Sequence, residues 1–82
     1  MRNEKLGKII CKRISDLMHQ NNLSVEQLAY QSGISKGGLS EIVRYKKDPS
    51  NYTILNICLA LNITMTEFFD FDELNNYTKE IS

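Results

Sequence analysis

Apolar side chains recur along most of the chain at intervals of three and four residues, which is the period of an amphipathic helix. The pattern is clearest in the first quarter of the chain, where charged residues surround one apolar stripe made of Leu6, Ile9, Ile10, Ile14, Leu17 and Met18. It predicts a helix over residues 5–20. We expect that helix to end at Asn21 and Asn22, because asparagine tolerates left-handed backbone geometry.

Helix-start signals divide the rest of the chain into four further short helices. Ser24 and Thr64 each open a capping box, with a glutamine or glutamate three residues later whose side chain can return the hydrogen bond. Gly33 ends the second helix, and Ser35 is the predicted N-cap of the third. A fourth helix follows from the apolar spacing over residues 54–61. No segment alternates with period two for long enough to favour a sheet, so the predicted fold is all-α with five helices.

Residues 1–82 are predicted to form a single domain, because the chain is too short for more than one hydrophobic core. The predicted core spans about residues 5–70, and we expect the acidic tail over 71–82 to be frayed or used in contacts between subunits. No apolar run approaches the roughly 18 residues that a membrane span needs, and the charged first ten residues leave no place for a secretory signal. Two cysteines 47 positions apart exclude a disulfide framework and a four-ligand zinc site. We therefore expect a reduced, cytoplasmic domain without membrane contact.

The formal net charge is zero, but the charges are unevenly distributed along the chain. Residues 1–47 carry nine lysines or arginines and four acids, a net charge of +5, whereas residues 48–82 carry one and six, a net charge of −5. Such asymmetry is typical of a protein in which one face meets a polyanion and the other faces solvent or a partner.

Residues 25–44 have the spacing of a helix-turn-helix unit. Two helices that cross steeply need a small residue where their backbones approach, and Ala29 supplies it. They also need a turn residue free of Cβ strain, which Gly33 supplies. The angle between the helices is then held by apolar residues on the inner side of the second helix, namely Ile34, Leu39 and Ile42.

The segment over residues 23–69 resembles the Cro and lambdoid phage repressor family, also called the XRE family of bacterial regulators. The residues that carry the resemblance are Leu23-Ser24, Gln27-Leu28-Ala29, Gly33-Ile34-Ser35, Leu39-Ser40, Ile42, Pro49, Ile57, Ala60-Leu61 and Glu67-Phe68-Phe69. With the first helix, the resemblance covers about residues 5–70. The part that follows the turn makes the match more specific than a helix-turn-helix pattern alone.

The resemblance implies a five-helix domain that binds double-stranded DNA as a homodimer on a palindromic operator, with the third helix in the major groove. The candidate base contacts lie on the outward side of that helix and are Ser35, Lys36, Gly37, Ser40 and Glu41. The candidate phosphate contacts are Ser24, Gln27, Arg44, Lys46, Lys47, Ser50, Asn51 and Tyr52. The implied activity is transcription regulation, and we expect a repressor.

Three departures from the family pattern change the expected contacts. Gly37 and Gly38 stand at the start of the recognition helix, where each costs roughly 1 kcal/mol relative to alanine and offers no side chain to a base. Val25 replaces a common glutamine, so one contact to DNA is missing. Met18 and Val43 replace a frequent arginine–glutamate pair, and we expect these two apolar side chains to touch in the core.

No group of residues forms a catalytic constellation. His19 is interpreted as a solvated side chain near a helix C-terminus, and Cys11 and Cys58 as core residues. The acidic cluster over residues 70–73 lacks the spacing of a calcium loop. We therefore expect no enzyme activity, no cofactor, no metal and no small-molecule substrate.

Other apolar residues are assigned to packing or to subunit contacts. Tyr30 and Tyr45 are expected to pack against helices rather than to touch bases. Leu59 replaces a residue that is commonly charged in the family, so we expect it to be exposed. With Phe71 and Leu74, it forms the predicted patch for dimerisation.

A second hypothesis comes from a different class of protein. Under this hypothesis the chain is a protein-interaction module, antitoxin-like or antirepressor-like, that keeps the fold but binds DNA weakly. The zero net charge, the paired glycines and Glu41 favour it. Among regulators, phage or mobile-element repressors, controller proteins of restriction–modification systems and antitoxins all remain open.

Overall fold

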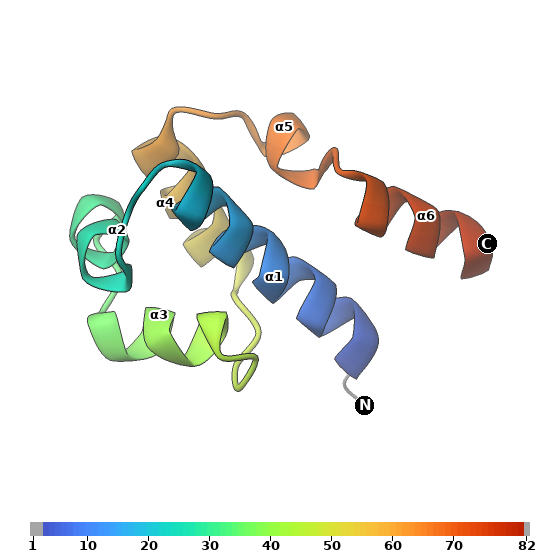
Figure 1. Cartoon of the computed structure of the whole chain (residues 1–82), viewed down its shortest axis with the longest axis horizontal. Coiled ribbons are helices and arrows are strands. Elements are labelled where there is room, and N and C mark those ends of the chain that lie inside the picture. The colour runs from blue at the N-terminus through green and yellow to red at the C-terminus, as the bar shows by residue number, and fades with distance from the viewer. Residues whose placement is uncertain (1–2, 82) are drawn as a thin grey trace.

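The chain is helical from its first described turn to its last. A computed structural model describes residues 3–81, and over this range it contains six helices and no strand (Figure 1). The helices are α1 (Glu4–Gln20), α2 (Val25–Ser32), α3 (Lys36–Val43), α4 (Asn51–Leu61), α5 (Met65–Phe69) and α6 (Asp72–Ile81). The all-α prediction is confirmed. The expected number of five helices is wrong by one, because the chain continues as α6.

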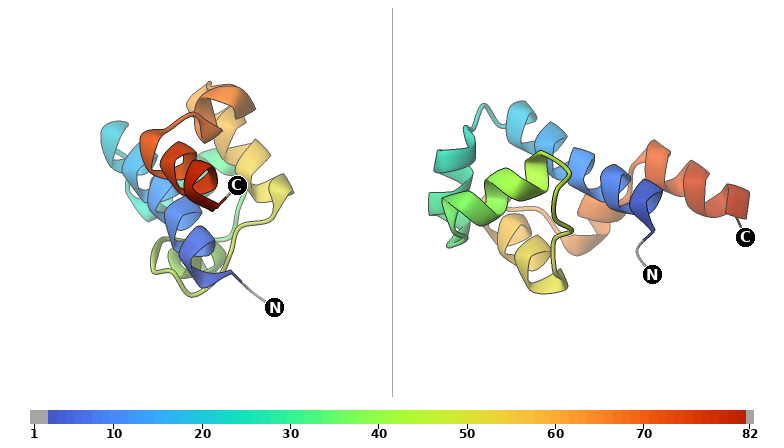
Figure 2. Two further views of the ribbon diagram at one scale, coloured as in Figure 1. Left: turned by 90° about the vertical axis from the view of Figure 1, so that its right-hand side faces the viewer. Right: turned by 90° about the horizontal axis from the view of Figure 1, so that it is seen from below.

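The acidic tail folds as α6 over residues 72–81, so the expectation of fraying is wrong there, and its use in contacts between subunits stays a prediction. Asp72 and Glu73 lie in its first turn and Lys79 in its last, an arrangement that suits the helix dipole. Tyr77 joins α6 to the start of α1, because the Asn3 amide nitrogen donates to its hydroxyl oxygen at 3.0 Å. Figure 2 shows α6 beside the N-terminal half of α1 in both views.

The first five helices begin in the same way. Each N-cap side-chain oxygen accepts a hydrogen bond from the amide three residues later, which satisfies one of the otherwise unpaired donors of a helix start. These N-caps are Asn3, Ser24, Ser35, Ser50 and Thr64. The two predicted capping boxes are confirmed, because the side chains of Gln27 and Glu67 return the hydrogen bond.

Three of the helix connections repeat one three-residue unit. A left-handed residue is followed by an apolar residue and then by an N-cap, in Asn22-Leu23-Ser24, Gly33-Ile34-Ser35 and Asn62-Ile63-Thr64. In each unit the amide of the apolar residue donates to the carbonyl five residues earlier, at 3.0 or 3.1 Å. This is the hydrogen bond of a Schellman turn, so each unit ends one helix, buries a side chain and starts the next helix.

One hydrophobic core lies where the first five helices meet. Its buried members are Cys11, Ile14, Leu17, Met18, Leu28, Ala29, Leu39, Ile42, Ile54, Ile57, Cys58 and Phe68. Neither cysteine forms a disulfide within the described chain, and both are buried, as expected of core residues. Burial raises the pKa of the Cys58 thiol, which keeps it protonated and unreactive.

Met18 and Val43 belong to the same packing environment. Met18 is buried in the core, and Val43 is half-buried against it. α1 and α3, which carry the two residues, pack against each other. That the two side chains touch stays a prediction.

Candidate nucleic-acid interface

The α2–turn–α3 unit presents one side of α3 to solvent. Gly33 adopts a left-handed conformation with φ of 69°, as the turn requires. Leu39 and Ile42 are buried on the inner side of α3, Ala29 is buried on α2, and Ile34 packs against the core from the turn. α3 lies along the lower edge of the molecule in Figure 1, and the view from below shows it beside the connection to α4 (Figure 2, right). Its outer side is therefore open to a large ligand.

The five candidate base contacts differ in exposure. Ser35, Lys36, Gly37 and Glu41 are exposed, whereas Ser40 is half-buried. Ser35 is also the N-cap of α3, and its hydroxyl accepts from the Gly38 amide at 3.1 Å. The structure thus places four of the five on the outer surface of α3.

Lys36 is paired across the turn. Its ammonium lies 3.3 Å from a carboxylate oxygen of Glu26 on α2, and the two side chains are 67% and 75% exposed. So exposed an ion pair contributes little stability, so Lys36 can exchange Glu26 for another acceptor. Sequence reasoning missed Glu26, because residues ten positions apart meet only once the turn is folded.

The two glycines of α3 have different surroundings. A Cβ atom at Gly37 would meet nothing within 4 Å, whereas one at Gly38 would lie 2.9 Å from the Ser35 hydroxyl oxygen. A side chain at position 38 would therefore require the Ser35 hydroxyl to shift slightly, although the other four N-caps accept from residues that carry a Cβ atom. No contact within the described chain requires a glycine at position 37.

The candidate phosphate contacts come from three places that flank α3. Ser24 and Gln27 are exposed at the start of α2, where they form the capping box. Arg44, Lys46 and Lys47 are exposed in the connection after α3. Ser50, Asn51 and Tyr52 are exposed at the start of α4. The start of α3 and the start of α4 meet at a hollow of about 200 Å³, lined by Ser35, Gly38, Lys47 and Ser50 among others.

The connection after α3 has an unusual backbone. Tyr45 adopts φ of 63°, a left-handed conformation that costs a bulky residue of order 1 kcal/mol or more. The Lys46 amide donates to the Glu41 carbonyl at 2.9 Å, which closes α3 with the same turn geometry as the three repeated connections. Tyr45 is 41% exposed and lies beside α1.

The aromatic and apolar residues assigned to packing or subunit contacts are not brought together. Tyr30 is 89% exposed, so the expectation that it packs against a helix is wrong. Leu59 is 71% exposed on α4, as expected. Phe71 instead lies under the Arg13 guanidinium, 4.8 Å from its ring centre, and Leu74 lines a groove with Ile10 and Phe69. Phe71 and Leu74 are both half-buried, and their part in subunit contacts stays a prediction.

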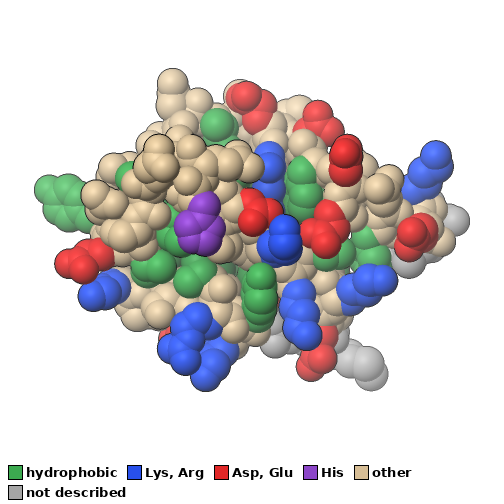
Figure 3. Space-filling model, in the orientation of Figure 1, with side chains coloured by type: hydrophobic (Ala, Val, Ile, Leu, Met, Phe, Trp, Pro, Cys, Tyr) green, Lys and Arg blue, Asp and Glu red, His purple; other side chains and the backbone are tan. Residues whose placement is uncertain are grey.

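The charge asymmetry of the sequence is also an asymmetry in space. Most lysine and arginine side chains in Figure 3 lie over the lower half, along α3 and the N-terminal half of α1. Most acidic side chains lie over the upper right, along α5 and α6. The positive side is therefore the side that presents α3.

These features define a helix-turn-helix DNA-binding domain, and comparison with known proteins agrees. The model of the Cro/C1-type helix-turn-helix DNA-binding domain family matches residues 13–73, and the chain belongs to this family. The chain is thus a DNA-binding transcription regulator by class. None of the described helices is long and apolar enough to cross a membrane. No curated protein shows significant similarity to the chain.

Two solved structures extend the comparison. The restriction–modification controller protein C.AhdI from Aeromonas hydrophila superimposes with a TM-score of 0.70 at 31% sequence identity, covering 79% of this chain and 97% of that one. A single-residue variant of the controller protein C.Esp1396I superimposes with a TM-score of 0.75 at 23% identity, covering 99% and 95%. The second likeness concerns the fold alone, and it extends over nearly the whole chain.

Proposed function

We propose that this chain is a sequence-specific transcription repressor that binds palindromic operator DNA as a homodimer, with α3 in the major groove. The observation that carries the proposal is the placement of α3. Its inner side is anchored in the core by Leu39 and Ile42, and its outer side is open. The exposed phosphate candidates stand on both sides of it, so phosphates could be held on either side of the groove.

Base readout would rest on few side chains. The Lys36 ammonium can donate to guanine O6 and N7 after it leaves Glu26, and the Glu41 carboxylate can accept from cytosine N4. The Ser40 hydroxyl can serve either base. Gly37 offers only backbone, which allows the duplex to approach α3 closely, so part of the specificity would come from DNA shape.

Phosphate contacts would set the position of the domain on the duplex. Arg44, Lys46 and Lys47 supply charge, and Ser24, Gln27, Ser50, Asn51 and Tyr52 supply neutral donors at the starts of α2 and α4. A phosphate near these helix starts is also favoured by the helix dipole. None of these contacts reads sequence directly.

The affinity test uses a duplex selected from a random-sequence library and titrated by fluorescence anisotropy at several salt concentrations. We expect log K to fall linearly with log salt, with a slope of about −0.9 for each phosphate contacted. Arg44→Gln and Lys47→Gln should each weaken binding to all sequences alike and reduce that slope by about 0.9. Lys36→Ala should instead relax the base preference. Absence of binding at low salt would contradict the proposal.

We place the dimer interface on α4. Leu55 and Leu59 are one helical turn apart and are 44% and 71% exposed, on a helix that carries no charged residue. Two copies of this face can meet about a two-fold axis, which matches a palindromic site. The proposed interface on α4 does not require Phe71 and Leu74, which are half-buried, and their part in subunit contacts stays a separate prediction.

Sedimentation equilibrium tests the dimer. We expect Leu59→Glu to shift the protein to monomer and to weaken binding to a two-half-site duplex far more than to a single half-site. Tyr30→Ala, which removes an even more exposed apolar side chain on α2, is the control and should stay dimeric. A wild-type protein that remains monomeric at all accessible concentrations would exclude the homodimer.

One observation favours the interaction module as the second candidate. The Lys36 ammonium, which base readout requires, is already paired with Glu26. Glu41 places a further carboxylate on the same surface. Both features weaken attraction to a polyanion. If the affinity test finds no binding at low salt, this second function becomes the better explanation.

A further inference from the structure

The N-terminal half of α1 carries three lysines, Lys5, Lys8 and Lys12, that line one groove but have different partners. Lys12 donates to Asp16 at 2.8 Å, and this hydrogen bond raises the pKa of the ammonium. Lys5 lies over the Tyr77 ring, 5.2 Å from its centre. Lys8 is exposed and makes no ion pair with any residue over 3–81. Of these three lysines, Lys8 is therefore the one whose ammonium makes no ion pair or ring contact with the described residues.

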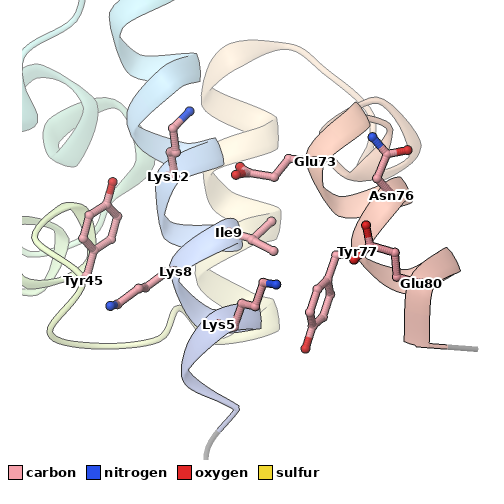
Figure 4. A pocket seen from close by; sticks show the side chains of 9 residues that line it. All are labelled: Lys5, Lys8, Ile9, Lys12, Tyr45, Glu73, Asn76, Tyr77 and Glu80. Atoms are coloured by element: carbon pink, nitrogen blue, oxygen red, sulfur yellow. The ribbon is translucent and has the colours of Figure 1, made fainter.

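The side chain of Lys8 also points in a different direction. In Figure 4 it extends towards the side of α1 on which Tyr45 lies, whereas Glu73 and Glu80 approach α1 from the opposite side, on α6. The carboxylates of α6 therefore border the groove without facing the Lys8 ammonium. An anion that reached Lys8 from the side of Tyr45 would avoid them.

That side of α1 adjoins the proposed DNA-binding surface. The start of α1 descends to the same lower edge as α3 in Figure 1 and in the left view of Figure 2. The connection after α3 is held against α1, because the Cys11 thiol donates to the Lys47 carbonyl at 3.4 Å. Tyr45, whose left-handed backbone turns this connection, lies beside Lys8. Lys8 thus extends the basic strip formed by Arg44, Lys46 and Lys47.

We propose that Lys8 is an outer phosphate contact, which binds the sugar–phosphate backbone of DNA flanking the half-site. The inference rests on the proposed function and adds a residue outside the helix-turn-helix unit. An ammonium is a point charge that attracts a phosphodiester oxygen without reading sequence. The acidic side of α6 marks where this strip ends, because phosphates beyond α1 would meet carboxylates.

The test compares Lys8→Gln with Lys12→Gln on two duplexes that share the selected site. One duplex carries about one helical turn of flanking DNA on each side, and the other is trimmed to the site. On the long duplex, Lys8→Gln should weaken binding several-fold and reduce the salt slope by about 0.9, with base preference unchanged. On the trimmed duplex, Lys8→Gln should bind like the wild type. Lys12→Gln is the matched control and should bind like the wild type on both.

Three results would overturn the inference. The first is equal binding of the wild type and Lys8→Gln on the long duplex, with α3-dependent base preference intact, which leaves the proposed function standing. The second is an equal loss for Lys8→Gln and Lys12→Gln, which would indicate general charge rather than a placed contact. The third is absence of wild-type binding at low salt, which removes the proposed function as well. Both substitutions change exposed side chains, so both variants should fold, and their thermal melts check this.

Discussion

Gly37 and Gly38 are adjacent in α3, but their surroundings differ. A side chain at position 38 would crowd the Ser35 hydroxyl that caps the helix, whereas position 37 has open space. Both residues lie in a helix, where glycine is unfavourable because its backbone loses the most entropy on folding. The glycine at position 37 therefore lowers the stability of the fold, and no described contact at this position compensates for that loss.

Gly37→Ala should separate stability from binding. We expect the free energy of unfolding to rise by about 1 kcal/mol, because alanine is the better helix former and its Cβ meets nothing. DNA affinity should fall if the duplex approaches the backbone here. Thermal melts and anisotropy titrations measure the two effects. Unchanged affinity would show that the duplex does not contact the backbone at position 37.

Met18 and Val43 are apolar residues on α1 and α3 that we predict to touch in the core. Met18→Arg alone should destabilise the fold by about 3 kcal/mol or more, because it leaves a buried charge without a partner. The double variant Met18→Arg with Val43→Glu should recover part of that loss if the two side chains touch. Urea denaturation of both variants gives the comparison. An unchanged midpoint for the single variant would contradict a buried contact.

At the scale of elements, one side chain of α1 contacts both the end of α5 and the residue that precedes α6. The Arg13 guanidinium donates to the carbonyls of Phe68 and Glu67 at 2.8 Å, and it lies over the Phe71 ring. The end of α5 has carbonyls without helical partners, and Arg13 satisfies two of them. The position of α6 thus depends on a residue that lies more than fifty positions away.

Arg13→Ala should loosen the last two helices more than the rest. We expect a loss of about 1–3 kcal/mol in global stability, because the part-buried carbonyl of Phe68 and the exposed carbonyl of Glu67 both lose a charged donor. Amide exchange in α6 should accelerate well beyond that in α2 and α3. Lys12→Ala, the neighbouring exposed lysine, serves as control and should change stability by about 0.5 kcal/mol or less. Uniform exchange rates across all helices would contradict the special role of Arg13.

The elements that the sequence predicted are those with local signals. Caps, capping boxes and apolar spacing lie within a few residues of one another, so the amino-acid sequence alone is enough to locate α1 to α5. α6 carries signals of the same kind, because Phe71, Leu74 and Tyr77 recur at helical spacing and acidic residues occupy its first turn, but its polar composition obscures them. Its position also depends on Asn3 and Arg13, whose proximity requires the whole fold.

At the scale of the whole molecule, charge separation along the chain becomes charge separation between faces. The basic first part of the chain supplies α1, α3 and the connection that follows α3, and the acidic last part supplies α6 (Figure 3). Such a distribution orients the domain as it approaches a polyanion. A zero net charge therefore says little about DNA binding, because in the proposed binding mode a duplex meets only the basic side.

The candidate site was predictable as far as the helix-turn-helix pattern extends. The order of turn, N-cap and buried positions located α3, and four of its five predicted outward residues are exposed, whereas Ser40 is half-buried. What the pattern could not supply were pairings across the fold, such as Lys36 with Glu26 or Lys8 beside Tyr45. Those depend on the angle between helices, which no local spacing encodes.

The repeated turns between α1 and α2, α2 and α3, and α4 and α5 have a consequence for how the chain folds. Each turn is closed by backbone hydrogen bonds between residues that are close in sequence. The arrangement of the first five helices therefore depends on few contacts between distant residues. We expect refolding from denaturant on the order of milliseconds or faster, as in other helical domains of low contact order. The contact of Tyr77 with Asn3 joins positions 74 apart and should form last. Stopped-flow fluorescence of the tyrosines, with Tyr77→Phe for comparison, measures this sequence of events.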